Sequence, residues 1–153
     1  MLDKSLLKIP SSFMVAGLVP FLFFNLLLLL EFEIGISSDR VVDLFKLYCF
    51  YISIFMAGVV WGISVAKRKD TKKDLKRNWF FFLSILTSLL TLVAFVAFTE
   101  KLFFVFISSI FCFYLLLDFY LYREERIDIS YLKLRLFITI LVVLSLIAAQ
   151  FSI

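Results

Sequence analysis

The sequence predicts an all-α membrane protein, a bundle of five transmembrane helices with a cytoplasmic N-terminus and an external C-terminus. Three observations support this. Hydrophobic residues make up 63% of the 153 residues and mean hydropathy is +1.06, whereas soluble domains are about 45–50% apolar. Five apolar stretches approach the length of a membrane span, and basic residues concentrate in alternate connections. We therefore expect a single transmembrane domain over residues 1–153, with no soluble domain attached.

The first apolar stretch, residues 13–30, follows two lysines and so resembles a signal peptide. No small-x-small cleavage site follows it, which favours a retained first helix. Pro20 should kink this helix near Gly17, because its ring displaces the carbonyl four residues back. Asn25 lies at mid-span and is expected to face a partner helix, since an amide exposed to lipid is costly.

The second apolar stretch, residues 47–66, should begin early, near Asp39, where serines offer N-caps. Gly58 and Gly62 form a G-x-x-x-G motif around Trp61, and both glycines lie on one helix face. We expect another helix of the same chain to pack closely on this face, with homodimerisation as the alternative. A second face of small residues predicts that this helix is central in the bundle.

Stretches 79–98 and 102–122 are joined by residues 99–101, too few for anything but a tight turn, which predicts an antiparallel hairpin. Four hydroxyls of the third stretch fall within a stripe of about 100°. They could line a polar pathway, but such groups more often bond to the carbonyl four residues back or to a neighbouring helix. They are Ser84, Thr87, Ser88 and Thr91.

Asp118 is the only acidic residue inside an apolar stretch, about 7 Å from the basic end of the fourth one. Arg135 opens the fifth stretch, residues 136–153, on the same side. We expect these side chains to form an ion pair that closes the hairpin of the last two helices, because an unpaired charge at this depth is costly. A ligand or proton site at Asp118 is the alternative.

Charge sets the predicted orientation. With five spans, 13 of the 16 basic residues fall on one side, which the positive-inside rule assigns to the cytoplasm. The loop between the second and third stretches could also bind anionic lipid at about 1 kcal/mol per basic residue. A nucleic-acid partner is not expected, because no folded basic domain accompanies the loop. The loop's basic residues are Lys67, Arg68, Lys69, Lys72, Lys73, Lys76 and Arg77.

The composition excludes several kinds of chemistry. The chain has no histidine, which rules out His-ligated haem, His-ligated zinc and Ser-His-Asp hydrolysis. Cys49 and Cys112 both lie in apolar stretches and are expected to act as small hydrophobic residues. Glycine-rich phosphate loops are also missing from the sequence. We therefore expect no enzyme activity, no metal and no cofactor.

Four motifs occur in an order that resembles a known family. They are Gly17-x-x-Pro20-Phe21, Gly58-x-x-Trp61-Gly62, Asp118 and Tyr131-x-x-Leu134-Arg135. Together they resemble the uncharacterised small bacterial membrane family that includes the eukaryotic transmembrane protein 69, over roughly residues 13–148. The third stretch departs from that pattern, because Trp79 stands only at its entrance and it lacks the family's proline and internal tryptophan. The resemblance implies a bacterial inner-membrane or mitochondrial setting and supplies no activity.

These observations favour a non-enzymatic accessory subunit or assembly factor that binds other membrane proteins in the bacterial inner membrane. The alternative is a small oligomeric transporter or channel, with Asp118 and the hydroxyls of the third stretch along its path. Lipid or quinone binding is the third possibility, suggested by the abundance of aromatic residues. Membrane lipids are expected partners in every case, and a homo-oligomer is compatible with each.

Overall fold

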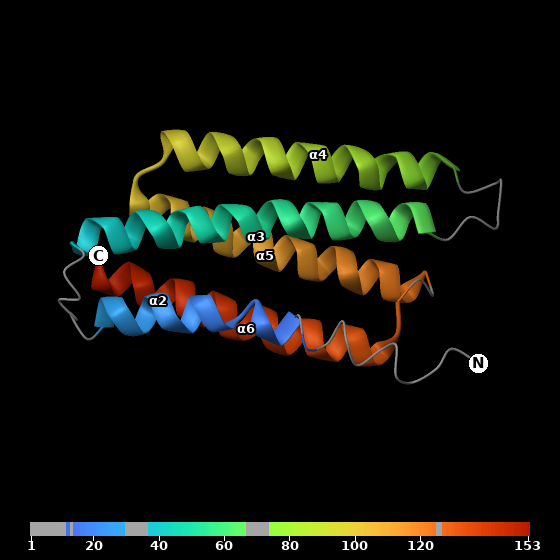
Figure 1. Cartoon of the computed structure of the whole chain (residues 1–153). Coiled ribbons are helices and arrows are strands. Elements are labelled where there is room, and N and C mark those ends of the chain that lie inside the picture. Colours follow the sequence, from blue (N-terminus) through green and yellow to red (C-terminus); the bar gives the residue numbers. More distant parts are fainter. Residues whose placement is uncertain (1–11, 13, 30–36, 67–73, 125–126) are drawn as a thin grey trace.

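The computed structural model describes residues 12, 14–29, 37–66, 74–124 and 127–153, without the side chains of residues 29, 63–66 and 74–78. These residues form long helices that run alternately up and down the molecule (Figure 1). No strand occurs among them, as the composition predicted. In chain order the helices are α2 (Val19–Leu29), α3 (Ser38–Ala66), α4 (Asp74–Ala97), α5 (Glu100–Arg123) and α6 (Ile129–Ser152).

Four of the helices form a closed ring and the fifth lies outside it. Helix α2 packs against α3 and α6, α3 packs against α5, and α5 packs against α6. Helix α4 lies along the outside of α3, with fewer contacts to α5, and forms one edge of the molecule in Figure 1. The predicted α4–α5 hairpin is present, with a turn at residues 98 and 99. The two helices of the hairpin nevertheless pack mainly on other helices, α4 on α3 and α5 on α6. Helix α3 contacts three other helices, as its predicted central position requires.

The core of the ring is aromatic toward the end where α3 and α5 begin. Phe45 of α3 lies 5.2 Å from Phe104 of α5 between ring centroids, and 5.9 Å from Phe21 of α2. Phe21 also meets Phe111 at 6.0 Å in an edge-to-face arrangement. All but Phe111, which is 5% exposed, are essentially inaccessible. Edge-to-face pairs add specificity to apolar burial, so this half of the bundle has a tightly packed aromatic centre.

Four helices are long and apolar enough to cross a membrane: Ser38–Gly62, Trp79–Ala97, Glu100–Arg123 and Ile129–Ser152. The first apolar helix is shorter than the 18 residues expected, and extends from Met14 to Leu28 in the described part of the chain. It turns at residues 17 and 18 before α2 begins at Val19. At 1.5 Å per residue, α2 spans only about 16 Å of a hydrocarbon layer about 30 Å thick.

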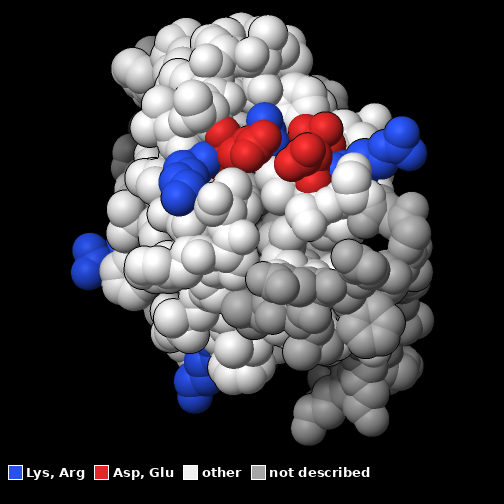
Figure 2. Space-filling view, turned by 90° about the vertical axis from the view of Figure 1, so that its left-hand side faces the viewer, with Lys and Arg blue, Asp and Glu red and all other residues white. Residues whose placement is uncertain are grey.

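Charged side chains gather at the ends of the bundle. Figure 2 looks onto the end where α3 and α5 begin, and shows acidic and basic groups side by side among uncharged residues. Lys46 lies over the ring of Phe103 at 5.7 Å, which holds its ammonium group against the rim of the aromatic core. The described residues of these first turns carry equal numbers of acids and bases: Asp39, Arg40, Asp43, Lys46, Glu100 and Lys101.

Candidate functional site

Asp118 and Arg135 form the predicted ion pair between α5 and α6. Arg135 Nε donates a hydrogen bond to Asp118 Oδ2 at 2.8 Å. The Asp118 side chain is fully buried and that of Arg135 is 11% exposed. Arg135 Nη2 also contacts the sulfur of Met56 on α3. The pair therefore links α5 and α6 and rests on the central helix.

One oxygen of this carboxylate has no partner. Asp118 Oδ1 is buried and accepts no hydrogen bond from the described residues. Tyr131, one turn before Arg135 on α6, is close enough to interact electrostatically with both charges. The pair is thus a neutral unit with an unused acceptor, at the end of the bundle where α6 begins.

A second polar layer lies one helical turn deeper and joins α3, α4 and α5. The hydroxyl of Tyr114, four residues before Asp118, lies 3.0 Å from Thr87 Oγ1 and 3.2 Å from the carbonyl oxygen of Ser53, and shares its one proton between these two acceptors. Ser53 Oγ and Thr91 Oγ1 are 3.1 Å apart. This layer fixes α4 onto the ring and is buried on all sides.

The hydroxyls of α4 mostly bond back along their own helix. Thr87 Oγ1 donates to the carbonyl of Leu83 at 2.8 Å, Ser88 to Ser84 at 2.9 Å, and Thr91 to Thr87 at 2.8 Å. Ser84 Oγ is the exception, buried and without a hydrogen bond to the described residues. The hydroxyls thus bond mainly to carbonyls of their own helix, and Thr87 and Thr91 also contact Tyr114 and Ser53 on neighbouring helices. A continuous row of free hydroxyls is not present among the described residues of α4.

Asn25 faces a partner helix, as expected for an amide at mid-span. Its Nδ2 donates to the carbonyl of Ser145 on α6 at 2.7 Å and contacts the Ser145 hydroxyl. Ser145 Oγ in turn donates to the carbonyl of Phe21 at 3.2 Å. The side-chain oxygen of Asn25 is buried without a partner in the described chain. This cluster fastens the short α2 to α6.

The break predicted at Pro20 is also present. The chain turns at Gly17 and Leu18, and Tyr48 of α3 donates its hydroxyl to the Gly17 carbonyl at 2.6 Å. A backbone carbonyl at a break in a helix needs such a donor in an apolar setting. Gly17 and Pro20 therefore shape a helix end that α3 caps.

The expected close packing of another helix of the same chain on Gly58 and Gly62 is not found among the described residues. Gly58 and Gly62 are both exposed, and a Cβ added at either would meet nothing within 4 Å. Trp61, beside them, is 55% exposed and touches Phe81 of α4 at its edge. The residues of α3 that face the ring are instead those in register with Phe45 and Val60. The helical period correctly predicted that Gly58 and Gly62 lie on one face of α3. It could not show whether another helix of the chain packs on that face.

The basic loop proposed to contact lipid falls largely outside the description. Lys67, Arg68, Lys69, Lys72 and Lys73 are not described, and Lys76 and Arg77 lie in the first turn of α4 without described side chains. The described residues contain no group of three or more acids or cysteines arranged to hold a metal ion.

Comparison with known families then places the chain. A family model described as a protein of unknown function, DUF3429, matches residues 8–151. The chain belongs to the DUF3429 family. No curated protein and no solved structure matches it. The family match covers the ion pair, both polar layers and the glycine face, and its description carries no activity.

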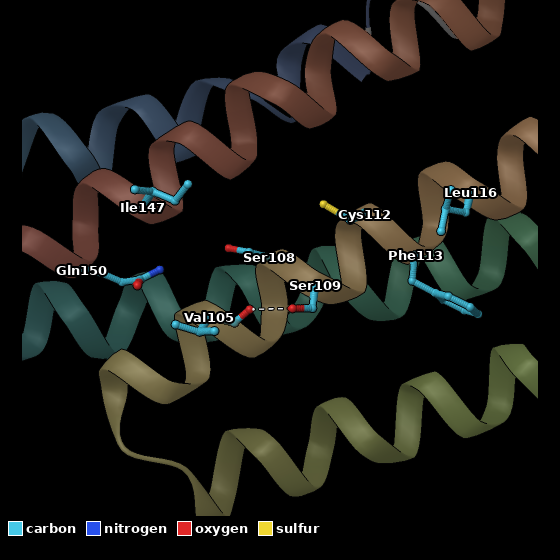
Figure 3. Close-up of a pocket in the computed structure, with 8 residues that line it drawn as sticks. All are labelled: Val105, Ser108, Ser109, Cys112, Phe113, Leu116, Ile147 and Gln150. Atoms are coloured by element: carbon cyan, nitrogen blue, oxygen red, sulfur yellow. Dashed lines mark hydrogen bonds between the residues drawn. The ribbon is translucent and has the colours of Figure 1, made fainter.

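The DUF3429 chain also has a shallow, open groove that the sequence reasoning did not find. It runs along α5 beside α6 and has a volume of about 510 Å³ (Figure 3). The groove is formed where α5 carries small side chains, those of Ser108, Ser109 and Cys112. The two serines donate hydrogen bonds to carbonyls of their own helix, and Cys112 is exposed. Gln150 of α6 closes one end. The spacing of Ser108 and Cys112, four residues apart, was the available signal, since it puts two small groups on one face.

Four residues that complete the polar layers were not singled out from the sequence. A tyrosine or a methionine in an apolar helix is usually a packing residue, so its type alone gives no signal. Tyr114 could have been found from its position four residues before Asp118, which puts both on one face. The four are Tyr48, Met56, Tyr114 and Ser145.

Proposed function

We propose that this DUF3429 protein is a non-enzymatic accessory subunit or assembly factor that binds another membrane protein through the exposed face of α3. One observation carries the proposal. Gly58 lies in the middle of the side of α3 that no described residue covers. Glycine inside a helix costs about 1 kcal/mol relative to alanine, and the described chain offers no close approach that would require it.

The rest of that face suits a helix contact. At 100° per residue, Leu47, Tyr51 and Gly58 fall within about 40° of one another, so they form one line along α3. Tyr51 is 61% exposed, and Phe55, beside the line, is 67% exposed. The two glycines leave a shallow groove on the helix surface, and the large aromatic side chains border it. A second helix can pack closely in such a groove, and van der Waals contact of this kind drives helix association in lipid. The occupant we propose is an apolar helix of another membrane protein.

The internal polar groups give less support to the transporter alternative. The α4 hydroxyls, apart from Ser84, donate to carbonyls of their own helix. Beyond the Tyr114 layer, Phe45, Phe103 and Phe104 are 0% exposed and fill the bundle. The groove on α5 favours the third possibility, a bound lipid or quinone, because it is apolar, open to lipid and bordered by one amide.

We further propose that all five apolar helices cross the bacterial inner membrane, with the N-terminus in the cytoplasm. Helices α2 and α6 run in the same direction along the bundle (Figure 1), which is compatible with an odd number of crossings. The basic residues of alternate connections support the orientation. We also propose that the chain is related to eukaryotic transmembrane protein 69, on the basis of the four sequence motifs.

Co-purification from native membranes tests the subunit proposal. We would extract tagged wild-type protein gently, determine the size of the particle and identify what co-purifies. The expected result is a stoichiometric second membrane protein that is lost from Gly58→Leu. Ala97→Leu is the matched control, because it enlarges an exposed small residue on α4, away from this face. It should retain the partner.

Other outcomes would contradict the proposal. A particle containing only this chain, whose size falls with Gly58→Leu, would indicate homodimerisation through the glycine face. A homo-oligomer that conducts ions or solute in liposomes, with flux abolished by Asp118→Asn, would establish the transporter alternative. Stoichiometric recovery of a quinone or one lipid species without any protein would favour the third possibility.

A further inference from the structure

The unused oxygen of Asp118 is the starting point. Oδ2 is occupied by Arg135 Nε at 2.8 Å, whereas Oδ1 is buried without a donor from the described residues. A carboxylate oxygen accepts two hydrogen bonds when it is ionised. When such an oxygen is buried without a hydrogen bond, it loses its hydration and no protein contact replaces it. The free-energy cost is larger for a charged acceptor than for a neutral one.

None of the described side chains around the pair donates a hydrogen bond to Oδ1. Arg135 directs Nε to Oδ2 and Nη2 to the sulfur of Met56, and a thioether has no donor. The Tyr114 hydroxyl, one turn deeper, already donates to the second polar layer. Tyr131 interacts with the pair only through space. In this arrangement of the side chains, a donor from outside them would complete the hydrogen bonding of Oδ1.

Charge and space limit what that donor is. Asp118 and Arg135 together are neutral, so a second cation would meet the guanidinium at close range in a medium of low dielectric constant. A neutral O–H donor avoids this repulsion. The Asp118 side chain is completely buried and that of Arg135 is only 11% exposed, which favours a small molecule over a side chain or a lipid headgroup.

The position of the site determines its source. Arg135 is 11% exposed and Tyr131 is partly buried, and both lie in the first two turns of α6. Toward the other end of the bundle, Phe45, Phe103 and Phe104 are completely buried. A small polar molecule therefore reaches the carboxylate past Arg135, from the end where α6 begins.

We propose that Asp118 Oδ1 binds one water molecule, which enters from this end and completes the hydrogen bonding of the ion pair. The site is a hydrated position at membrane depth that neither the family match nor the proposed partner binding assigns. It does not depend on the glycine face of α3, so either proposal can fail alone. Water supplies an O–H donor without adding charge, and buried waters typically make two to four such bonds.

Solid-state NMR on the intact protein in lipid bilayers tests this. The carboxyl carbons of aspartate and the β-carbons of cysteine would be labelled with ¹³C, and magnetisation would be transferred from mobile water. We expect the Asp118 carboxyl signal to build up with that of the exposed Asp128. Cys49, which is 0% exposed in the aromatic half, is the dry reference and should lag behind both.

Assignment does not depend on one variant. Asp118→Asn removes its own carboxyl resonance, and if that variant fails to accumulate, Asn substitution of each of the six other aspartates in turn assigns the spectrum by elimination. An Asp118 signal as slow as that of Cys49 would overturn the proposal. Build-up from lipid protons without build-up from water would also overturn it, and would identify a lipid hydroxyl as the donor.

Discussion

At the scale of single residues, the Asp118–Arg135 pair decides whether α5 can lie in a membrane at all. A lone carboxylate at this depth is expensive, and the 2.8 Å bond to Arg135 is the direct compensation. A buried pair adds little compared with apolar residues of the same shape, but removing one partner is severe, because it leaves the other charge uncompensated. The pair is therefore better described as a condition for correct packing than as a source of stability.

Removing one partner gives the first prediction. Asp118→Ala should destabilise the protein by about 3–5 kcal/mol, because it leaves Arg135 desolvated without a counter-charge. The measurement is membrane accumulation together with thermal unfolding in detergent. The double variant Asp118→Arg with Arg135→Asp should recover part of the loss, and Asp128→Ala, at an exposed position, should change neither quantity. Normal accumulation of Asp118→Ala with loss of cellular function would instead make Asp118 a ligand or proton site.

A single hydroxyl gives the second prediction. Tyr48→Phe removes the hydroxyl that donates to the Gly17 carbonyl at 2.6 Å. It should lower the free energy of unfolding by about 0.5–1.5 kcal/mol, and the loss should be larger if the carbonyl stays unpaired. Tyr51→Phe is the control, since Tyr51 is 61% exposed. Equal effects of the two substitutions would show that the carbonyl finds another donor.

At the scale of helices, the sequence predicted positions better than partners. The order of the helices and the turn at residues 98 and 99 followed from the apolar runs and the short connection, and the break near Pro20 followed from its ring chemistry. The lengths did not follow as well, because the first helix is shorter than its apolar run and α6 begins at Ile129, before the apolar run that starts at residue 136. The Asp118–Arg135 pair followed because both residues must lie at one end of adjacent helices. The face of α3 carrying Gly58 was misassigned, because periodicity defines which residues share a face but not whether the chain covers it. Tyr114 was missed, because its hydroxyl acts only through residues on two other helices.

The exposed glycine face gives the third prediction. Gly58→Ala should leave the isolated protein unchanged or stabilise it by up to about 1 kcal/mol, since alanine favours the helix and its Cβ meets nothing. Ala57→Leu is the contrasting control, because Ala57 is 3% exposed and overpacking there should cost about 1–3 kcal/mol. Reversible unfolding in detergent measures both. A large loss from Gly58→Ala would mean that a helix of this chain does cover the face.

At the scale of the whole molecule, the ring of α2, α3, α5 and α6 is distinct from α4, which is held mainly by α3 and by the Tyr114 layer. The ring closes between the first and last helices of the chain, so it cannot be completed until α6 has been synthesised. Helix α4 needs only its predecessor α3 for most of its contacts. The structure therefore predicts that α3 and α4 associate before the ring closes.

Membrane topology is the fourth prediction. Reporter fusions after Leu30, Lys73, Thr99, Glu125 and Ile153 should read outside, inside, outside, inside and outside, because the basic connections are retained in the cytoplasm. The short first helix makes the fusion after Leu30 the most informative one. An inside reading there, with the rest unchanged, would require that α2 does not span the membrane. Two disagreements in the series would rule out the five-span topology.

The two cysteines differ in a way that offers a spectroscopic probe. Cys49 is sealed in the aromatic core, whereas Cys112 is exposed in the α5 groove, near the midpoint of that helix. A nitroxide reagent applied to the unaltered protein in detergent should thus attach at one site. After reconstitution, its relaxation by oxygen and by a water-soluble nickel complex would report the depth of α5 in the bilayer. The dipolar coupling between two labels would measure the separation of two copies, should they pair.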